Sequence, residues 1–280
     1  MRDPHEQQSL SALIPQAITR VLKESSVAAL ATLVEAQRSI GAKLLVEETG
    51  ARTGSLTDAA LDEAIARHVP FFLASRAEAK TLKVEEFAHV NFEWDQARVL
   101  FERIEPEPRV VICGAGHVGA SLARLARTAG YRATLIDDRA DFLTRERFPE
   151  EEIDLVIART WADAVREVVG RGRGVSVAVV TRGHNEDEEC LRAVVEALPD
   201  YVGLIGSKRR TNIVLERLRA GGTDESVLSN VRAPIGLDIG AVSPEEVALA
   251  ILAEIVVERR GGTGAPLSAW RRKQGGRRQR

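Results

Sequence analysis

The chain has 280 residues, which is enough for one large domain or two modest ones. Hydrophobic residues make up 44% and charged residues 29%, a balance typical of a globular protein. The net charge of −2 argues against a protein that coats nucleic acid, and no apolar run approaches the roughly 20 residues of a membrane span. The first residues, MRDPHEQQ, contain no apolar signal core, so we expect a cytoplasmic protein.

Residues 1–104 predict a small α+β domain, because apolar runs alternate there with helix-periodic stretches. We expect a first helix whose regular part begins only near Pro15, since proline suits a first helical turn. The predicted elements are helices at Ser9–Glu24 and Thr57–Ala66 and strands at Val27–Val34, Ala42–Glu47, Leu82–Phe87 and Val99–Ile104.

A charged, proline-spaced segment, Glu105-Pro106-Glu107-Pro108, predicts a linker at residues 105–108. Strands and helices alternate in residues 109–260, a pattern that predicts a Rossmann-like, doubly wound parallel sheet. The expected strands are Val110–Cys113, Ala133–Asp137, Ile153–Ile157, Val175–Val180 and Tyr201–Ile205.

The helices of this second domain have recognisable starts. Ser243-Pro244-Glu245-Glu246 predicts a last helix that reaches Glu258, because serine caps, proline suits the first turn and the glutamate completes a capping box. Residues 261–280 are basic and rich in glycine and glutamine, and we expect a disordered tail. The other helices are expected to begin near His117, Ala140, Trp161, Asn185 and Ser207.

The segment VVICGAGHVG is the most informative part of the sequence. It joins an apolar run to Gly-x-Gly-x-x-Gly, and the next predicted strand ends in Asp137. Gly114 permits a tight turn, Gly116 lets a phosphate approach the backbone, and Gly119 lets helix and strand pack closely. An acid at the end of the second strand accepts hydrogen bonds from ribose hydroxyls and repels a 2′-phosphate. The segment therefore predicts a nucleotide-type binding fold with an anion at the helix N-terminus.

Further candidates follow the predicted strands, because ligands of such sheets bind at the carboxyl ends of the strands. His117 and His184 can contact a ligand or simply lie in a first helical turn. Ser207 and Lys208 can bind an anion or be a helix cap with a solvated charge. The predicted cofactor-binding residues are Gly114, Gly116, His117, Gly119, Asp137, Arg182, His184, Ser207 and Lys208.

Other chemistries find no support in the sequence. The five histidines and two cysteines show no zinc-ligand spacing, no Gly-x-Ser-x-Gly elbow follows a strand, and no P-loop lysine is present. Cys113 falls in a predicted core strand and Cys190 in a predicted helix, so we expect no disulfide. We therefore predict neither catalytic nor metal-ligating residues.

Four stretches together resemble the xanthine dehydrogenase accessory proteins, the XdhC/CoxI family. They are VVICGAGHVGASLARLARTAGYRATLIDDRADFLTRERFP, VVTRGHNEDEECL, YVGLIGSKRR and APIGLDIGAVSPEEVALAILAEIV, and they cover about residues 109–260. The resemblance implies a chaperone that binds molybdenum cofactor and assists its sulfuration by a cysteine desulfurase-type sulfurtransferase. It also implies transfer of the cofactor to a molybdenum hydroxylase apoenzyme, and a homodimer. From the net charge and the lack of a long apolar run we expect no nucleic-acid or membrane partner.

The first domain resembles the family only in outline. Where the family has Gly-Ser-x-Pro-Arg, a Gly-Ser-x-Gly-Gly-Gly-Cys loop and a later Cys-Gly-Gly, this chain has RSIG, GSLTD and FAH. We therefore expect a divergent member that keeps the ligand of the second domain. Two alternatives stay open: an NAD(P)-dependent oxidoreductase with Asp137 on the ribose, and a nucleotide-sensing regulatory module.

Overall fold

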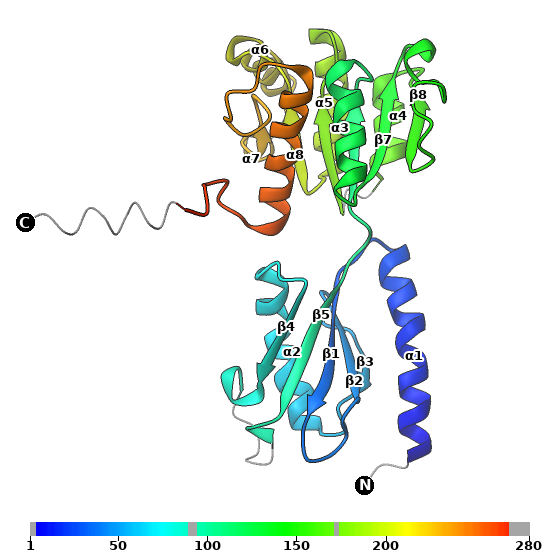
Figure 1. Ribbon diagram of the computed structural model, residues 1–280, viewed down its shortest axis with the longest axis vertical. Helices are drawn as coiled ribbons and strands as arrows, with labels where there is room; N and C mark the ends of the chain where they lie inside the picture. Colours follow the sequence, from blue (N-terminus) through cyan, green and yellow to red (C-terminus); the bar gives the residue numbers. More distant parts are fainter. Residues whose placement is uncertain (1–3, 89–93, 171–173, 269–280) are drawn as a thin grey trace, which may run out of the picture. The chain divides into compact units, whose positions relative to one another are not determined.

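The structure is a computed structural model that describes residues 4–88, 94–170 and 174–268. The chain divides into two compact units, Met1–Pro106 (unit 1) and Glu107–Arg280 (unit 2), and the expected linker spans the division. Figure 1 shows an antiparallel sheet with its helices in unit 1 and a layered α/β arrangement in unit 2. The predicted fold class is confirmed. Residues 269–280, most of the expected disordered tail, lie outside the described residues.

Unit 1 is built on a five-stranded sheet in the order β3-β2-β1-β5-β4, and each neighbouring pair is antiparallel. One apolar cluster joins helix α1 to the sheet, and its members include Ile14, Ala17, Val21, Leu30 and Leu45. Helix α2 packs against the sheet in a second apolar cluster. The elements are α1 (Pro4–Lys23), β1 (Ala28–Glu35), β2 (Lys43–Glu47), β3 (Arg52–Ser55), α2 (Ala59–Ala74), β4 (Ala79–Lys83), the short 3-10 helix η1 (Val84–Glu86) and β5 (Arg98–Ile104).

Several predictions for unit 1 were inexact, and one strand was missed. The helix expected at Thr57–Ala66 is α2, which begins at Ala59 and continues to Ala74. Helix α1 does not begin at Pro15 but runs through it, and Thr19 Oγ1 donates a hydrogen bond to the Pro15 carbonyl at 2.8 Å. The strand expected at Leu82–Phe87 is β4, which ends at Lys83 and is followed by η1. Strand β3 was not predicted, because none of its four residues is buried and it lies at the sheet edge, so it lacks an apolar pattern.

Unit 2 contains a six-stranded parallel sheet in the order β11-β10-β9-β6-β7-β8. Strand β6 is central, and the chain order runs outward from it in both directions, which is the doubly wound arrangement. The strands are β6 (Arg109–Cys113), β7 (Arg132–Asp137), β8 (Ile153–Ile157), β9 (Val175–Val179), β10 (Tyr201–Leu204) and β11 (Val231–Arg232).

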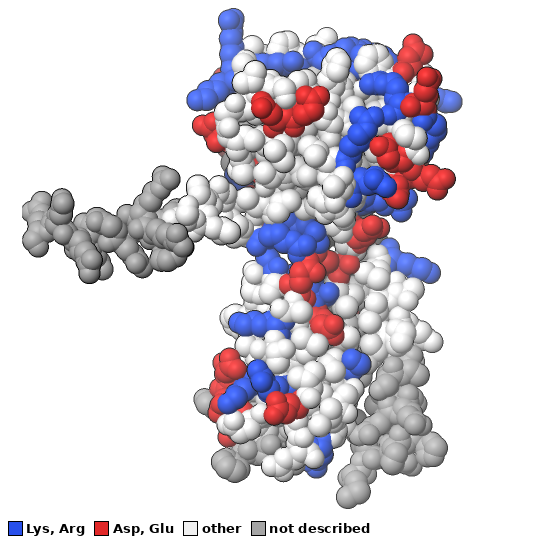
Figure 2. All heavy atoms as spheres, viewed as in Figure 1, with Lys and Arg blue, Asp and Glu red and all other residues white. Residues whose placement is uncertain are grey.

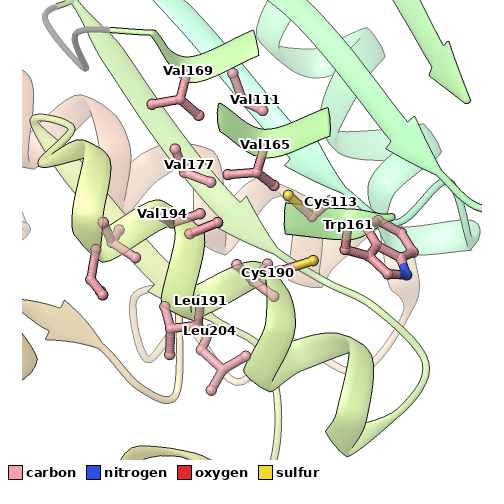
Figure 3. Close-up of a cluster of buried hydrophobic side chains, with 14 of the residues drawn as sticks. Val111, Cys113, Trp161, Val165, Val169, Val177, Cys190, Leu191, Val194 and Leu204 are labelled. Carbon is pink, nitrogen blue, oxygen red and sulfur yellow. The ribbon is translucent and has the colours of Figure 1, made fainter. Parts of the chain in front are cut away.

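The helices cover both faces of this sheet, because strand residues alternate between the two sides. Val110 and Ile112 of β6 pack in the cluster of α3 and α8, whereas Val111 and Cys113 pack in that of α4 and α5. Figure 3 shows part of the second cluster, including the side chain of Trp161. The helices are α3 (His117–Thr128), α4 (Trp161–Val169), α5 (His184–Ala197), α6 (Lys208–Ala220), α7 (Glu225–Leu228) and α8 (Pro244–Arg260).

The α/β alternation expected in unit 2 is confirmed with one exception. The helix expected near Ala140 is only the short 3-10 helix η3 (Ala140–Phe142), which is followed by turns up to β8. The capping box of α8 is present as expected, since Ser243 Oγ accepts from the Glu246 amide and the Glu246 carboxylate accepts from the Ser243 amide. Helix α7 and strand β11 are too short to give a periodic signal, and neither was predicted.

Candidate functional site

The strand order places one candidate site in unit 2. Strand β6 lies between β9 and β7, so the chain leaves β6 and β9 toward opposite halves of the sheet. Ligands of doubly wound folds bind at this reversal point, outside the carboxyl ends of the strands. The loops that leave β6, β7 and β9 are therefore neighbours. Gly114, Gly116 and Arg182 lie on these loops, and Asp137, His117 and His184 are the end residues of elements that the loops join.

The three glycines of the loop after β6 differ in what the fold requires of them. Gly114 has φ +119°, and a Cβ there would lie 2.6 Å from the Val180 carbonyl oxygen. A Cβ on Gly119 would lie 1.8 Å from the Gly114 carbonyl oxygen, so helix and turn touch at this point. A Cβ on Gly116 would meet no atom within 4 Å. Packing therefore explains Gly114 and Gly119 but does not explain Gly116.

Gly116 is the N-cap of α3, with extended backbone angles, and no side chain caps the helix there. The first N–H groups of any α-helix have no acceptor inside the helix, and they carry the positive end of its dipole. Open space above Gly116 gives a ligand access to these groups. The loop can thus accept a phosphate-sized anion.

Asp137 holds the glycine loop in place. It ends β7 with only 1% of its surface exposed, and its Oδ2 accepts a hydrogen bond from the Ala115 amide at 2.7 Å. The guanidinium of Arg139 pairs with both carboxylate oxygens, at 2.9 Å each. Burial raises the pKa of Asp137, but the hydrogen bonds from Arg139 and Ala115 outweigh it and lower the pKa to about 2. Asp137 is therefore ionised and already satisfied by the protein.

An ion pair spans the carboxyl end of β6. Arg182, after β9, donates two hydrogen bonds of 2.8 Å to the two carboxylate oxygens of Asp138, after β7. Because β6 lies between these two strands, the pair links the loops on either side of the glycine turn. Arg182 also lies 3.6 Å from Glu186 of α5. An anion at the site would compete with these carboxylates for Arg182.

The remaining predicted residues begin helices. His117 is the first residue of α3 and His184 the first of α5, and both are exposed. Ser207 caps α6, because its Oγ accepts from the Arg210 amide at 3.3 Å, and Lys208 is the exposed first residue of that helix. In this structure the Ser207 hydroxyl therefore acts as the helix cap, one of the two roles considered for it.

A buried acid that was not among the predicted site residues lies beside these loops. Asp187 in the first turn of α5 is 0% exposed, and it accepts from Thr181 Oγ1 at 2.5 Å and from Arg210 Nε at 2.8 Å. These contacts tie the exit of β9 to the starts of α5 and α6. A signal was available, since Asp187 shares the buried helix face of Cys190, Leu191 and Val194 and interrupts its apolar pattern.

A second positioning acid lies on α8. Glu254 Oε2 accepts a hydrogen bond from Tyr201 Oη at 2.5 Å and one from the Gly236 amide at 2.8 Å. Burial and the neighbouring Glu254 carboxylate raise the pKa of Tyr201, so its hydroxyl remains a donor. Glu254 therefore fixes the glycine-containing loop that follows β11.

The N-terminus of helix α2, in unit 1, does not suit an anion. Asp58 caps α2, and its Oδ1 accepts from the Ala60 and Leu61 amides at 2.9 and 3.0 Å. Its Oδ2 accepts from Trp94 Nε1 at 3.1 Å. These hydrogen bonds, the one from Leu61 above all, lower the pKa of Asp58 against a smaller effect of burial. The carboxylate occupies the position that an anionic ligand would take.

Two absences apply to the described residues alone. None of the helices in residues 4–88, 94–170 and 174–268 is long and apolar enough to cross a membrane. Within the same ranges, no group of three or more histidine, cysteine, aspartate or glutamate side chains is placed to hold a metal ion.

Comparison with known proteins finds relatives that share part of this chain. The uncharacterized protein YqeB of Escherichia coli (strain K12) is 32% identical over 157 residues, which cover 56% of this chain and 28% of YqeB. A probable xanthine dehydrogenase subunit of Bacillus subtilis (strain 168) is 32% identical over 60% of this chain and 48% of its own length. The molybdenum cofactor insertion chaperone PaoD of E. coli is 31% identical over 84 residues, 30% of this chain and 26% of PaoD. The chain thus spans less than half the length of these curated relatives.

A solved structure has the same fold along most of the chain. It is described as a xanthine dehydrogenase from Bacillus halodurans, and it covers 91% of this chain and 98% of its own with a TM-score of 0.50 and 17% identity. The family comparison is more specific than this likeness. Residues 110–255 match the XdhC Rossmann domain, and residues 21–85 match the XdhC and CoxI family, so both units contribute to the match. The chain therefore belongs to the XdhC and CoxI family.

Proposed function

We propose that this protein is an accessory protein for a xanthine dehydrogenase-type molybdenum hydroxylase. Its cargo is molybdenum cofactor or the nucleotide form of that cofactor, which it binds in unit 2, protects during sulfuration and delivers to the apoenzyme. Membership of the XdhC and CoxI family supports the role, as do relatives named for xanthine dehydrogenase and for insertion of molybdenum cofactor.

The observation that carries the binding site is the open space above Gly116. Neither backbone strain nor packing requires glycine at this position, since φ is −67° and no atom lies within 4 Å of a Cβ built there. A ligand that approaches the backbone closely gives glycine a function there. The phosphate of the cofactor fits this place, with the N–H groups of the first turn of α3 as donors.

The basic residues around the reversal point are suited to the other anionic groups of the cofactor. Arg182 and Lys208 supply charged donors, and His117 and His184 supply exposed ring nitrogens at two helix starts. In unit 1, by contrast, the Asp58 carboxylate fills the N-terminus of α2. We therefore assign the cargo to unit 2 alone. When bound, the cofactor supplies the molybdenum centre that is sulfurated, and the protein's residues hold it and limit its exposure.

The proposal includes two partners and a second copy of the chain. A cysteine desulfurase-type sulfurtransferase would supply the sulfur, and the molybdenum hydroxylase apoenzyme would receive the cofactor. A homodimer is the expected assembly. Co-purification of the chain with each partner from a molybdenum-replete host, followed by native mass spectrometry, tests both partners and the stoichiometry.

The central experiment changes Gly116. Gly116→Val places a branched side chain in the open space without backbone strain, so the melting temperature is expected to change little and bound cofactor to be lost. Gly116→Ala is expected to show a smaller loss. Cofactor retained on purified protein, and activation of a molybdenum hydroxylase in a coupled assay, are the two measurements. Full retention in Gly116→Val would refute the glycine-turn site.

A second pair of variants tests the basic residues. Arg182→Ala and Lys208→Ala are expected to lower cofactor retention about tenfold each, since a charge-assisted hydrogen bond contributes about 1.5–3 kcal/mol. Arg217→Ala is the matched control, because Arg217 lies near the other end of α6 and pairs with Glu188 at 3.4 Å. Cofactor retention at the wild-type level in Arg182→Ala and Lys208→Ala, as in the control, would exclude Arg182 and Lys208 from the site.

A further inference from the structure

Arg139 presents an unused donor group beside the glycine turn. It pairs with Asp137 side-on, through Nε and Nη2, so its Nη1 faces away from the carboxylate. Within the described residues, Nη1 makes no hydrogen bond, and about a third of the Arg139 side chain is exposed. The pair also compensates the negative charge of Asp137. The end of β7 therefore presents a guanidinium edge to solvent and hides the Asp137 carboxylate. The neighbouring Asp138 carboxylate, 3.9 Å from Arg139 Nε, is paired with Arg182.

Arg147 brings a second guanidinium to the same place. Its Nη1 donates to the Phe142 carbonyl at 2.8 Å, and its Nη2 donates to the carbonyl of Ala115, in the glycine loop, at 3.4 Å. In the described part of the chain its hydrogen-bond partners are these two neutral oxygens, and no carboxylate forms an ion pair with it. The positive charge of Arg147 is thus uncompensated next to the loop.

One aromatic ring fixes the two guanidinium groups. The Cζ atom of Arg139 lies 3.6 Å from the centroid of the Phe142 ring, and that of Arg147 lies 4.8 Å from it. Phe142 belongs to η3, directly after β7, so the β7 exit and the short 3-10 helix together hold both arginines. Figure 2 shows basic side chains gathered over α3 and β7, bordered by acidic ones. Stacking holds the two cations at fixed positions that both reach solvent.

We propose that Arg139 and Arg147 form a subsite for the 2′-phosphate of an adenine nucleotide, so that unit 2 takes NADP(H)-type ligands in preference to NAD(H)-type ligands. In doubly wound folds the diphosphate lies on the glycine turn and the ribose lies toward the end of the next strand, where an arginine accommodates a 2′-phosphate. This preference is the reverse of the one that Asp137 predicts from sequence. The inference does not depend on the accessory role, although a dinucleotide and the cofactor would use the same glycine turn and would bind in competition.

Calorimetry with matched nucleotides tests the subsite on the full chain. Adenosine 2′,5′-bisphosphate is compared with 5′-AMP, and NADP⁺ with NAD⁺, because each pair differs only in the 2′-phosphate. The wild-type protein is expected to bind the 2′-phosphorylated member at least about tenfold more tightly, the effect of one charge-assisted contact. Arg147→Gln is expected to reduce the ratio to about threefold or less, because the affinity for the 2′-phosphorylated nucleotide falls more than the affinity for its partner.

The controls separate charge, geometry and folding. Arg147→Lys keeps the charge without the planar fork and is expected to give an intermediate ratio. Arg127→Gln removes an arginine near the other end of α3, where it pairs with Glu152 at 3.0 Å, and is expected to keep the wild-type ratio. Equal affinity for both members of each pair, no binding of either, or an unchanged ratio in a folded Arg147→Gln protein would overturn the subsite. Hydroxylase activation that persists in those cases would leave the accessory role standing.

Discussion

Asp137 illustrates how a residue can match a motif and serve a different purpose. Its position at the end of β7 is the one from which an acid contacts a ribose, yet its oxygens accept from the Ala115 amide and from Arg139. The carboxylate connects the glycine turn to the neighbouring strand. Its low pKa has a measurable consequence for stability, because a group that is easier to ionise in the folded protein stabilises the fold when it is charged.

The pH dependence of Asp137→Asn tests this role. The folded pKa of about 2 lies below the ordinary value of 3.8, so the ionised carboxylate stabilises the fold by about 2 kcal/mol above pH 4. This contribution is lost as the pH falls from about 4 toward 2. Chemical denaturation at pH 7 is expected to show the variant about 2 kcal/mol less stable, with a smaller difference at pH 3.

The matched control is Asp138→Asn, the neighbouring acid with an exposed partner. Its free energy of unfolding is expected to change by less than about 1 kcal/mol, as is usual for exposed ion pairs. A difference between Asp137→Asn and wild type that stays constant from pH 7 to pH 3 would contradict the charge-based explanation.

At the scale of elements, the site depends on three loops that leave neighbouring strands. The glycine loop follows β6, Asp138 follows β7 and Arg182 follows β9, and the ion pair joins the two outer loops. A ligand that uses Arg182 must separate it from Asp138. Breaking the Arg182–Asp138 pair costs the free energy by which the pair stabilises the unliganded protein. The binding free energy of an anion at the site is reduced by that amount.

Asp138→Asn is expected to raise the affinity for ADP up to about fivefold, because an exposed ion pair contributes about 0.2–1 kcal/mol. Calorimetry on the full chain measures the change. Asp163→Asn is the control, since it removes an exposed carboxylate 3.7 Å from Arg166 on α4. Weaker binding in Asp138→Asn would mean that Asp138 orients Arg182 for the ligand and does not compete with it.

The elements with strong periodic signals were predicted closely from the sequence, whereas those without them were missed or were expected to be longer than they are. The strands that carry the glycine turn are continuous apolar runs, so β6 and β7 agree with the prediction to within a residue. The exposed edge strand β3 and the single-turn helix η3 have no such pattern. Residues on η3 and after it, such as Phe142 and Arg147, therefore reach the site by a route that spacing alone does not reveal.

Side-chain roles at the site were harder to predict than its location. The glycine turn and the strand exits follow from the order of the elements. The partners of Asp137, Arg182 and Asp187 depend on which side chains meet after folding. The contact of Arg182 joins two loops, and that of Asp187 with Arg210 joins two helices. A motif fixes the position of a residue on the backbone, but the neighbouring side chains decide what remains available to a ligand.

At the scale of the whole molecule, the two units have separate apolar clusters. Unit 1 contains an aromatic group around His68, whose ring lies 4.7 Å from that of Phe87 and 5.2 Å from that of Phe101. Burial lowers the pKa of His68, and the charge of Lys80 lowers it further. The neutral imidazole is thus the form that unit 1 favours.

The stability of unit 1 should therefore depend on pH near neutrality. The unfolded chain protonates His68 near its ordinary pKa of 6.5, before the folded unit does, so stability is highest above that pH and falls below it. His68→Phe is expected to remove this part of the pH dependence between pH 7.5 and 5.5, as measured by calorimetry. His184→Gln, an exposed histidine in unit 2, is the control. A wild-type decline that persists in His68→Phe would assign it to other groups.

The reactivity of the two cysteines can report the opening of unit 2. Both are free and 0% exposed, both lie in unit 2, and Figure 3 shows their sulfur atoms in the same core between the sheet and α5. Burial, and then the neighbouring Cys113 thiol, raise the pKa of Cys190, so the reactive thiolate is disfavoured in the folded state. A thiol reagent can therefore react only after this core opens. Since the chain has no other cysteine, the rate of thiol labelling reports the opening of unit 2 alone. A nucleotide or cofactor that binds unit 2 is expected to slow this labelling, so binding can be detected without an engineered probe.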